Sequence, residues 1–233
     1  MARERQGRSL AEDLYAAVRS DILFGRRLPG SRIQINDLAE QHGVSLGVVR
    51  EAVTRLASED LVEATPQRGF RVRSISLADL RDLTWVRVQL ETLALRESIV
   101  KGDITWETNL VAAHYRLAAT PTYFDDGSGN PEWMAVHGAF HAALTAGAGS
   151  PHLERLRRQL YDASELYRYW SGSLPSRPIR RDATDEHQAI CEAALARDTD
   201  KAVSLLAAHL ETTARQLEAA VNEVAGSDTS LAV

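Results

Sequence analysis

Apolar residues recur every three to four positions along most of the chain, and this spacing marks one face of an α-helix. Behind Ser9, which can cap a helix, residues 9–24 form the first such stretch. Its apolar face holds Leu10, Leu14, Ala17, Val18 and Ile22. The segment GRRLPGSRI that follows contains two glycines and a proline, so we expect the helix to end there.

Two shorter helices follow in quick succession. The first fits INDLAEQH, residues 35–42, and Gly43 stands where a helix C-terminal cap is expected. The second fits SLGVVREAVTRLASED, residues 45–60, with Ser45 as its N-cap. This order, a helix, a tight turn containing glycine and then a second helix, is typical of a helix-turn-helix.

The pattern then changes to an alternation of apolar and polar residues. It runs through LVEATPQRGFRVRSI, residues 61–75, on either side of PQRG, and predicts two short strands joined by a turn. A helix-turn-helix followed by a hairpin is a winged helix. The alternative is a small helical bundle with a hairpin that does not touch DNA.

From Ser76 onward the helical pattern is almost continuous. It predicts a bundle of about six helices, at residues 76–102, 103–119, 131–147, 150–170, about 179–196 and 198–222. We therefore expect a mainly α protein, with a winged helix-turn-helix domain at 8–75 and an all-α bundle at 76–223. The tail at 224–233 is expected to be disordered.

Charge divides the chain in the same way. Residues 1–75 hold 12 Arg against 10 Asp or Glu, a balance of +2, and the remaining residues hold 15 Lys or Arg against 22 acids, a balance of −7. The two parts are therefore expected to have different partners. No apolar run reaches the about 18 residues of a membrane span, and the N-terminus lacks the apolar core of a signal peptide, so we expect a cytoplasmic protein without membrane contact.

Four histidines fall on apolar helical faces that point inward. His137 and His141 stand four apart in HGAFHAAL, His187 is in register with Ile190, and His209 is beside Leu210. Burying several imidazoles without partners is unfavourable, and a metal ion would satisfy their neutral nitrogens. The alternative is a set of hydrogen-bonded core residues. Cys191 can in principle join as a ligand, although a small buried hydrophobe is the simpler interpretation.

These motifs together resemble a known family. LPGSRIQINDLAEQHGVSLGVVREAVTRLASEDLVEATPQRGFRV is similar to the winged-helix domain of GntR-family bacterial transcription regulators. VRVQLE, FHAAL, GSPHL, EHQAI and AHL resemble the helical effector domain of the FadR branch, called the FCD domain. The resemblance covers about residues 8–222. It implies a DNA-binding regulator, by default a repressor, and not an enzyme.

The resemblance also implies how DNA is read. The helix after Ser45 would lie in the major groove, with Arg50 of VREA on guanine, and the wing residues Arg68 and Gly69 would approach the minor groove. Relatives often have Arg or Lys, Thr and Pro after the serine, but this chain has Leu46, Gly47 and Val48. Leu46 can contact a thymine methyl group instead. The alternative role for Arg50 is a surface ion pair.

Two further expectations concern partners on the DNA side. Asn36 stands where some relatives place a basic residue on the preceding helix, so its DNA contact is a hypothesis of its own. A monomeric reader of this size would bind weakly, so we expect a homodimer on a palindromic double-stranded operator.

For the second domain, the resemblance implies a divalent metal and a small organic acid. FHAAL, EHQAI and AHL match family segments that supply three histidine ligands, His141, His187 and His209. His137 stands where relatives often have Asp, and the all-imidazole set favours zinc, with nickel as a second possibility.

A carboxylate effector would bind at the metal, with Arg87 and Tyr161 as further contacts. Pairing of Arg87 with Glu91 one turn away is the alternative for that arginine. Two other functions stay open, a metal-dependent hydrolase, although HExxH is absent, and a purely structural metal site. Nothing is assigned to His114 and His152.

Overall fold

The computed structural model describes residues 9–23, 25–65, 69–74, 76–125, 130–172 and 183–228, with the side chains of 169–172 and 220–228 left out. The chain divides into two compact units. One comprises residues 1–79 with 162–175, and the other comprises residues 80–161 with 176–233.

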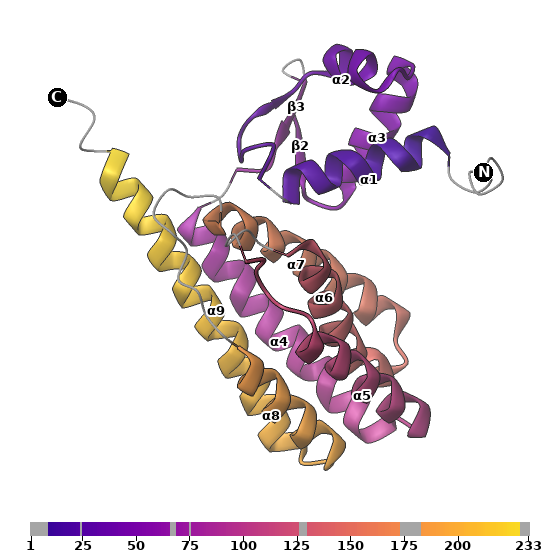
Figure 1. Ribbon diagram of the computed structural model, residues 1–233, viewed down its shortest axis with the longest axis vertical. Helices are drawn as coiled ribbons and strands as arrows, with labels where there is room; N and C mark the ends of the chain where they lie inside the picture. Colours follow the sequence, from indigo (N-terminus) through magenta and orange to yellow (C-terminus); the bar gives the residue numbers. More distant parts are fainter. Residues whose placement is uncertain are drawn as a thin grey trace. The chain divides into compact units, whose positions relative to one another are not determined.

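In the described part of the chain up to residue 74, the first unit folds into helices and a small sheet (Figure 1). In chain order these are α1 (Leu10–Leu23), β1 (Arg32–Ile33), α2 (Ile35–His42), α3 (Leu46–Ser58), β2 (Val62–Thr65) and β3 (Gly69–Val72). The strands are antiparallel in the order β1-β3-β2, and Thr65 of β2 pairs with Gly69 of β3. The predicted helix-turn-helix and hairpin are therefore present. β1 was not predicted, because two residues are too few to show an alternating pattern.

Local capping chemistry sets the turn between α2 and α3. Gly43 adopts a left-handed backbone with φ of 63°, and its N–H donates to the carbonyls of Ala39 and Glu40. Glycine has no Cβ to oppose this conformation. The hydroxyl of Ser45 accepts a hydrogen bond from the N–H of Val48 at 3.3 Å, which caps α3 as expected. The two helices then pack through a shared core that includes Leu38, Val49, Val53 and Leu56.

The second unit is a helical bundle. Its helices are α4 (Leu77–Lys101), α5 (Ile104–Ala119), α6 (Pro131–Thr145), α7 (Pro151–Gly172), α8 (Thr184–Leu195) and α9 (Thr199–Asp228), with a 3₁₀ turn at Ala146–Ala148. α5 packs against α6 and α8, and α8 packs against α9. α4 begins and α7 ends among residues that belong to the first unit. Among the described residues, no helix is both long and apolar enough to cross a membrane.

The bundle is held by an apolar core and by side-chain caps. Buried residues of α4, α5, α6, α8 and α9 meet there, among them Leu95, Leu110, Phe140, Leu144, Ile190 and Leu206. Asp103 caps α5 by accepting from the N–H of Trp106 at 3.0 Å, and Asn130 caps α6 by accepting from Glu132. These caps agree with the predicted helix starts.

The C-terminal end differs from the prediction. Helix α9 continues to Asp228, so the disordered tail expected from residue 224 is wrong for residues 224–228, and residues 229–233 lie outside the described part. The residues before Gly226 are acceptable helix formers, and a single glycine costs a helix only about 1 kcal/mol. Helix α8 begins at Thr184, while the first four residues of its predicted range, 179–182, are not described.

Candidate functional site

The start of α3 presents an exposed surface in the first unit. Ser45, Gly47 and Arg50 are exposed, and 47% of the Leu46 surface is accessible. The Ser45 oxygen is used by the cap, but its hydroxyl hydrogen can still be donated. The first turn of α3 also offers backbone N–H groups toward an anion, because the first N–H groups of a helix have no partner within it.

Arg50 and Arg55 lie on the same helix but in different surroundings. Arg55 stacks over the Tyr15 ring at 3.9 Å from its centroid and pairs with Glu59 at 3.6 Å. Arg50 is exposed and, within the described part of the chain, forms no ion pair. The alternative role for Arg50, a surface ion pair, therefore finds no acidic partner among these residues.

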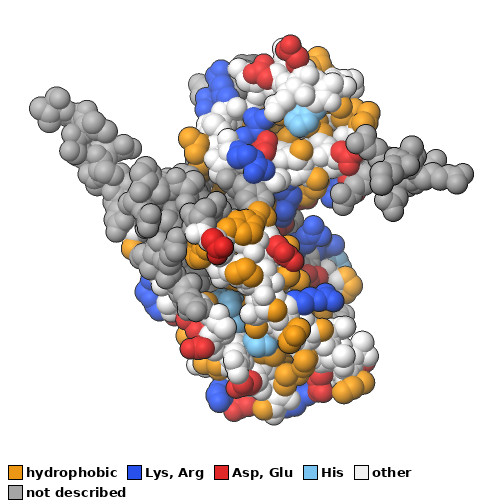
Figure 2. Space-filling model, viewed as in Figure 1, with side chains coloured by type: hydrophobic (Ala, Val, Ile, Leu, Met, Phe, Trp, Pro, Cys, Tyr) orange, Lys and Arg blue, Asp and Glu red, His pale blue; other side chains and the backbone are white. Residues whose placement is uncertain are grey.

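The other predicted DNA-contacting residues lie on α2 and the wing. Asn36 is exposed on α2, and Gly69 is exposed at the start of β3 with φ of 82°. A Cβ at Gly69 would meet nothing within 4 Å, so the backbone conformation and not space favours glycine there. Arg68 lies outside the described residues. On the face drawn in Figure 2, blue Lys and Arg side chains are scattered among red, white and orange ones.

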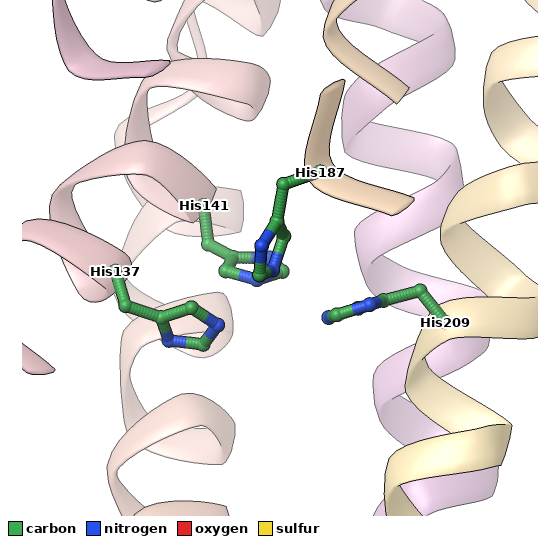
Figure 3. A group of neighbouring side chains, drawn as sticks. All are labelled: His137, His141, His187 and His209. Carbon is green, nitrogen blue, oxygen red and sulfur yellow. The ribbon is translucent and has the colours of Figure 1, made fainter. Parts of the chain in front are cut away.

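In the second unit, four histidines from three helices converge. His137 and His141 come from α6, His187 from α8 and His209 from α9, and all are at most 3% exposed. Each offers one nitrogen, and these four atoms lie within 4.8 Å of one another (Figure 3). The ring centroids of His137 and His141 are 4.6 Å apart, and those of His187 and His209 are 4.7 Å apart. The four residues singled out from the sequence therefore form one buried cluster.

The cluster has the chemistry and size of a metal site. Zn–N bonds of about 2.0–2.1 Å place the nitrogens of a tetrahedral site roughly 3.3 Å apart. The four nitrogens here lie within 4.8 Å of one another, an upper limit that is wider than this spacing, and together they could hold a metal ion. Imidazole is a ligand that zinc, nickel and copper accept well, whereas calcium and magnesium prefer oxygen.

Oxygen atoms lie behind three of the four rings. Nδ1 of His137 lies 3.1 Å from the Tyr161 hydroxyl, and Nδ1 of His209 lies 2.9 Å from Oε2 of Glu186. Nδ1 of His141 is 3.8 Å from Oε2 of the buried Glu91. Such outer contacts orient histidines in metal sites.

Arg87 is held by Glu91, one helical turn further along α4. Its Nε and Nη2 donate to Oε1 of Glu91 at 2.9 and 2.7 Å, and both side chains are buried. The guanidinium also lies over the ring of Tyr161, 5.5 Å from its centroid. The intrahelical pair that the sequence offered as an alternative is therefore present, beside the histidine cluster.

A pocket of about 350 Å³ adjoins the cluster, between α5, the segment after it, α6 and the start of α8. His187 lines this pocket and belongs to the cluster, and Trp133 lines it and stacks on His137 with ring centroids 4.6 Å apart. The remaining described lining comprises His114, Leu117, Ala118, Thr120, Pro121, Thr122, Tyr123, Ala183 and Thr184. Sequence reasoning missed these residues, because they come from separate segments with no shared motif.

Two residues near the cluster have altered acidity. Burial lowers the pKa of His114, which favours a neutral ring at the pocket wall. Burial raises the pKa of Cys191 to about 11, so its thiol stays protonated, and the side chain packs in the apolar core. Cys191 is not in the group of four clustered residues, in line with its interpretation as a small hydrophobe.

Comparisons with known proteins match the two parts of the chain to two different families of domains. Residues 10–72 match the model of bacterial regulatory proteins of the gntR family, and residues 82–212 match the FCD domain. The chain is 38% identical to the uncharacterized HTH-type transcriptional regulator BphR of Paraburkholderia xenovorans LB400, over 88% of this chain and 83% of that protein. It is 32% identical to the HTH-type transcriptional repressor GlaR of Escherichia coli K12, over 86% of this chain and 92% of that protein.

Solved structures share the fold. Escherichia coli McbR/YncC superposes with a TM-score of 0.74 at 21% identity, covering 91% of this chain and 98% of that one. A putative GntR transcriptional regulator from Rhodococcus sp. RHA1 gives 0.69 at 23% identity, covering 90% and 97%. The relatives are transcription regulators and not enzymes. The chain therefore belongs to the GntR family of bacterial regulatory proteins and is a DNA-binding transcription regulator with a C-terminal FCD domain.

Proposed function

We propose that the protein is a repressor whose DNA binding is controlled by a small carboxylate, bound beside a divalent metal held by His137, His141, His187 and His209. The observation that carries the proposal is the buried cluster of four histidines adjoining a pocket of about 350 Å³. A purely structural metal site would not need a pocket lined by one of its ligands. The repressor role follows the description of the relative GlaR as a transcriptional repressor.

The donor set supports an anionic effector. Four neutral imidazoles leave the whole positive charge of a divalent ion in place, whereas a carboxylate ligand at position 137 would cancel part of it. When bound, the metal would supply a positive centre, and a carboxylate oxygen would bind it as a further ligand beside the four imidazoles. We propose zinc as the metal, with nickel as the alternative.

The effector's other contacts are proposed from the groups nearest the cluster, Tyr161 and Arg87, which are not among the described residues that line the pocket. The Tyr161 hydroxyl lies at His137, and the guanidinium of Arg87 lies over the Tyr161 ring. Because Glu91 already pairs with Arg87, an anionic effector would have to share this arginine with Glu91. The pocket wall at Trp133 and Leu117 suits the apolar carbons of the effector.

On the DNA side we propose a homodimer on a palindromic operator. Arg50 would read guanine, Leu46 a thymine methyl, and Ser45, Gly47, Asn36, Arg68 and Gly69 would contact the backbone or groove walls. The exposure of the described members of this set supports the assignment. The domain boundary at residue 75 also stays a proposal, since the two family matches leave residues 73–81 between them.

Control by an effector requires that it bind one arrangement of the protein better than another. The coupling between effector and operator is then about 1–3 kcal/mol, or roughly 5–150-fold in operator affinity. Since affinity for DNA depends strongly on salt, this coupling has to be measured at one salt concentration.

The test begins with protein purified without a metal-affinity tag and analysed for its elements. Thermal shifts are then measured with acetate, succinate, glutarate and citrate, with and without added zinc, because binding to the native state raises the melting temperature. We expect about one metal ion per chain and a zinc-dependent shift with at least one acid. The same acid should weaken operator binding in a mobility-shift titration. Bound metal with no response to any acid would favour a purely structural site instead.

A further inference from the structure

Two contacts behind the histidine cluster point to a second layer of functional residues. The carboxylate of Glu186 on α8 faces Nδ1 of His209 on α9 at 2.9 Å, and the hydroxyl of Tyr161 on α7 faces Nδ1 of His137 on α6 at 3.1 Å. Each contact joins two helices at the outer nitrogen of a clustered ring. Neither oxygen belongs to the four-residue group itself.

These contacts select a tautomer. A neutral imidazole carries its proton on one nitrogen, and a metal can bind only the other. An ionised carboxylate is only an acceptor, so opposite Glu186 the proton of His209 belongs on Nδ1. The hydroxyl of Tyr161 can accept in the same way from His137. Both rings then present Nε2 as the nitrogen available to a metal ion.

Glycine at position 138 makes room for the Tyr161 contact. A Cβ added to Gly138 would lie 3.2 Å from the Tyr161 hydroxyl oxygen and 3.4 Å from Cε1 and Cζ of its ring. The 3.2 Å separation is tighter than ordinary van der Waals contact, so the Tyr161 hydroxyl would have to shift by a few tenths of an ångström. The glycine beside His137 therefore allows Tyr161 to approach α6 closely enough to reach that histidine.

Glu186 and His187 divide two tasks between neighbouring positions on α8. His187 is 3% exposed and belongs to the cluster, while the Glu186 side chain is 39% exposed and reaches His209. Consecutive side chains point about 100° apart on a helix. His187 can therefore point into the cluster while Glu186 contacts the outer nitrogen of His209.

We propose that Glu186 and Tyr161 are positioning residues that hold His209 and His137 with Nε2 directed at the metal. The proposal rests on the proposed metal site and adds two residues to it. For His137, the Tyr161 hydroxyl would orient the ring, which explains how an imidazole can act as a metal ligand at this position. The role is compatible with an effector contact, because the Tyr161 hydroxyl can accept from His137 and donate its own hydrogen to an effector oxygen.

The test compares variants that remove the outer oxygens with matched controls. Glu186→Ala removes the acceptor, Glu186→Gln keeps an acceptor oxygen without its charge, and Tyr161→Phe keeps the ring without the hydroxyl. Glu192→Gln on α8 and Tyr115→Phe on α5 are the controls, since Glu192 is exposed and Tyr115 is 74% exposed. Zinc affinity is measured by competition with a chromophoric chelator, and the melting temperature is recorded for the metal-free proteins.

We expect Glu186→Ala and Tyr161→Phe to weaken zinc binding about 10–100-fold, the usual effect of removing an outer partner of a metal-bound histidine. Glu186→Gln should fall between Glu186→Ala and the wild type, and the controls should stay within about twofold. The visible spectrum of the cobalt-loaded protein should change in Glu186→Ala and Tyr161→Phe but not in the controls.

Other outcomes separate the two proposals. A wild type that binds no zinc, nickel or cobalt overturns the metal site and the positioning roles with it. A wild type that binds metal, with Glu186→Ala and Tyr161→Phe binding it equally well, overturns the positioning roles alone. A lower metal-free melting temperature with unchanged affinity also overturns the positioning roles, since the oxygens would then serve only the stability of the bundle.

Discussion

The two units of the chain place their candidate functional residues in opposite environments. In the first unit, the described members of the set proposed to contact DNA are exposed and lie in the stretch from Asn36 to Gly69. In the second unit, the four histidines are at most 3% exposed and come from three helices. An exposed side chain of the first kind that makes no cap, such as that of Arg50, can be replaced with little effect on folding. Buried residues of the second kind affect binding and stability together.

The largest effect is expected in the buried cluster. With metal at about 1,000 times its Kd, binding stabilises the native protein by about 4 kcal/mol. His141→Ala should lose this metal-dependent part, so that added zinc no longer raises the free energy of unfolding in urea. His152→Ala, at an exposed position on α7, should keep the whole response. An undiminished zinc response in His141→Ala would remove that residue from the ligand set.

Arg50→Ala should be the next largest change and should act on binding alone. We expect operator affinity to fall by about 1–3 kcal/mol, measured by mobility shift at fixed salt. The free energy of unfolding should change by less than about 0.5 kcal/mol, because Arg50 is exposed. In the wild type, the Arg55 side chain stacks on Tyr15. Arg55→Ala should therefore lower the free energy of unfolding and leave operator affinity unchanged. Equal operator affinity for Arg50→Ala and the wild type would contradict the assignment.

Ser45→Ala tests a residue that is both exposed and structural. Ser45 is exposed, yet its oxygen caps α3. Loss of the cap should lower the free energy of unfolding by about 1 kcal/mol. Ser45→Asp, which keeps a capping oxygen, should recover stability but add a negative charge where DNA phosphates are expected. If both variants bind the operator as the wild type does, Ser45 is a cap and not a DNA contact.

Cys191 tests the helical unit without a substitution, through the reactivity of its buried thiol. Burial raises the pKa of this thiol to about 11, so the folded state favours the protonated form. Its contribution to stability is therefore full at neutral pH and falls as pH rises above the ordinary thiol value toward 11. At pH 8, iodoacetamide should modify the native protein more than about tenfold more slowly than the urea-unfolded protein, because the thiolate is the nucleophile. Equal rates would place Cys191 in a solvent-accessible site.

Much of the fold follows from short-range signals. The cap at Ser45 and the left-handed Gly43 act over three or four residues, so the sequence predicted both directly. It also predicted the helix starts that Asp103 and Asn130 cap. Strand β1 could not, because its two residues are held by pairing with β3 and not by their own pattern. The end of α9 was also missed, since one glycine is a weak signal for helix termination.

The sequence by itself determined the helix-turn-helix, the hairpin and the inward faces that carry the histidines, because each depends on periodicity and on local capping. It also suggested, through resemblance, that those histidines belong together. Only the tertiary structure decided that Glu186 and Tyr161 stand behind His209 and His137, that Glu91 holds Arg87, and that a pocket reaches His187. These contacts join residues of different helices or depend on side-chain conformation, and no local pattern encodes the packing that brings them together.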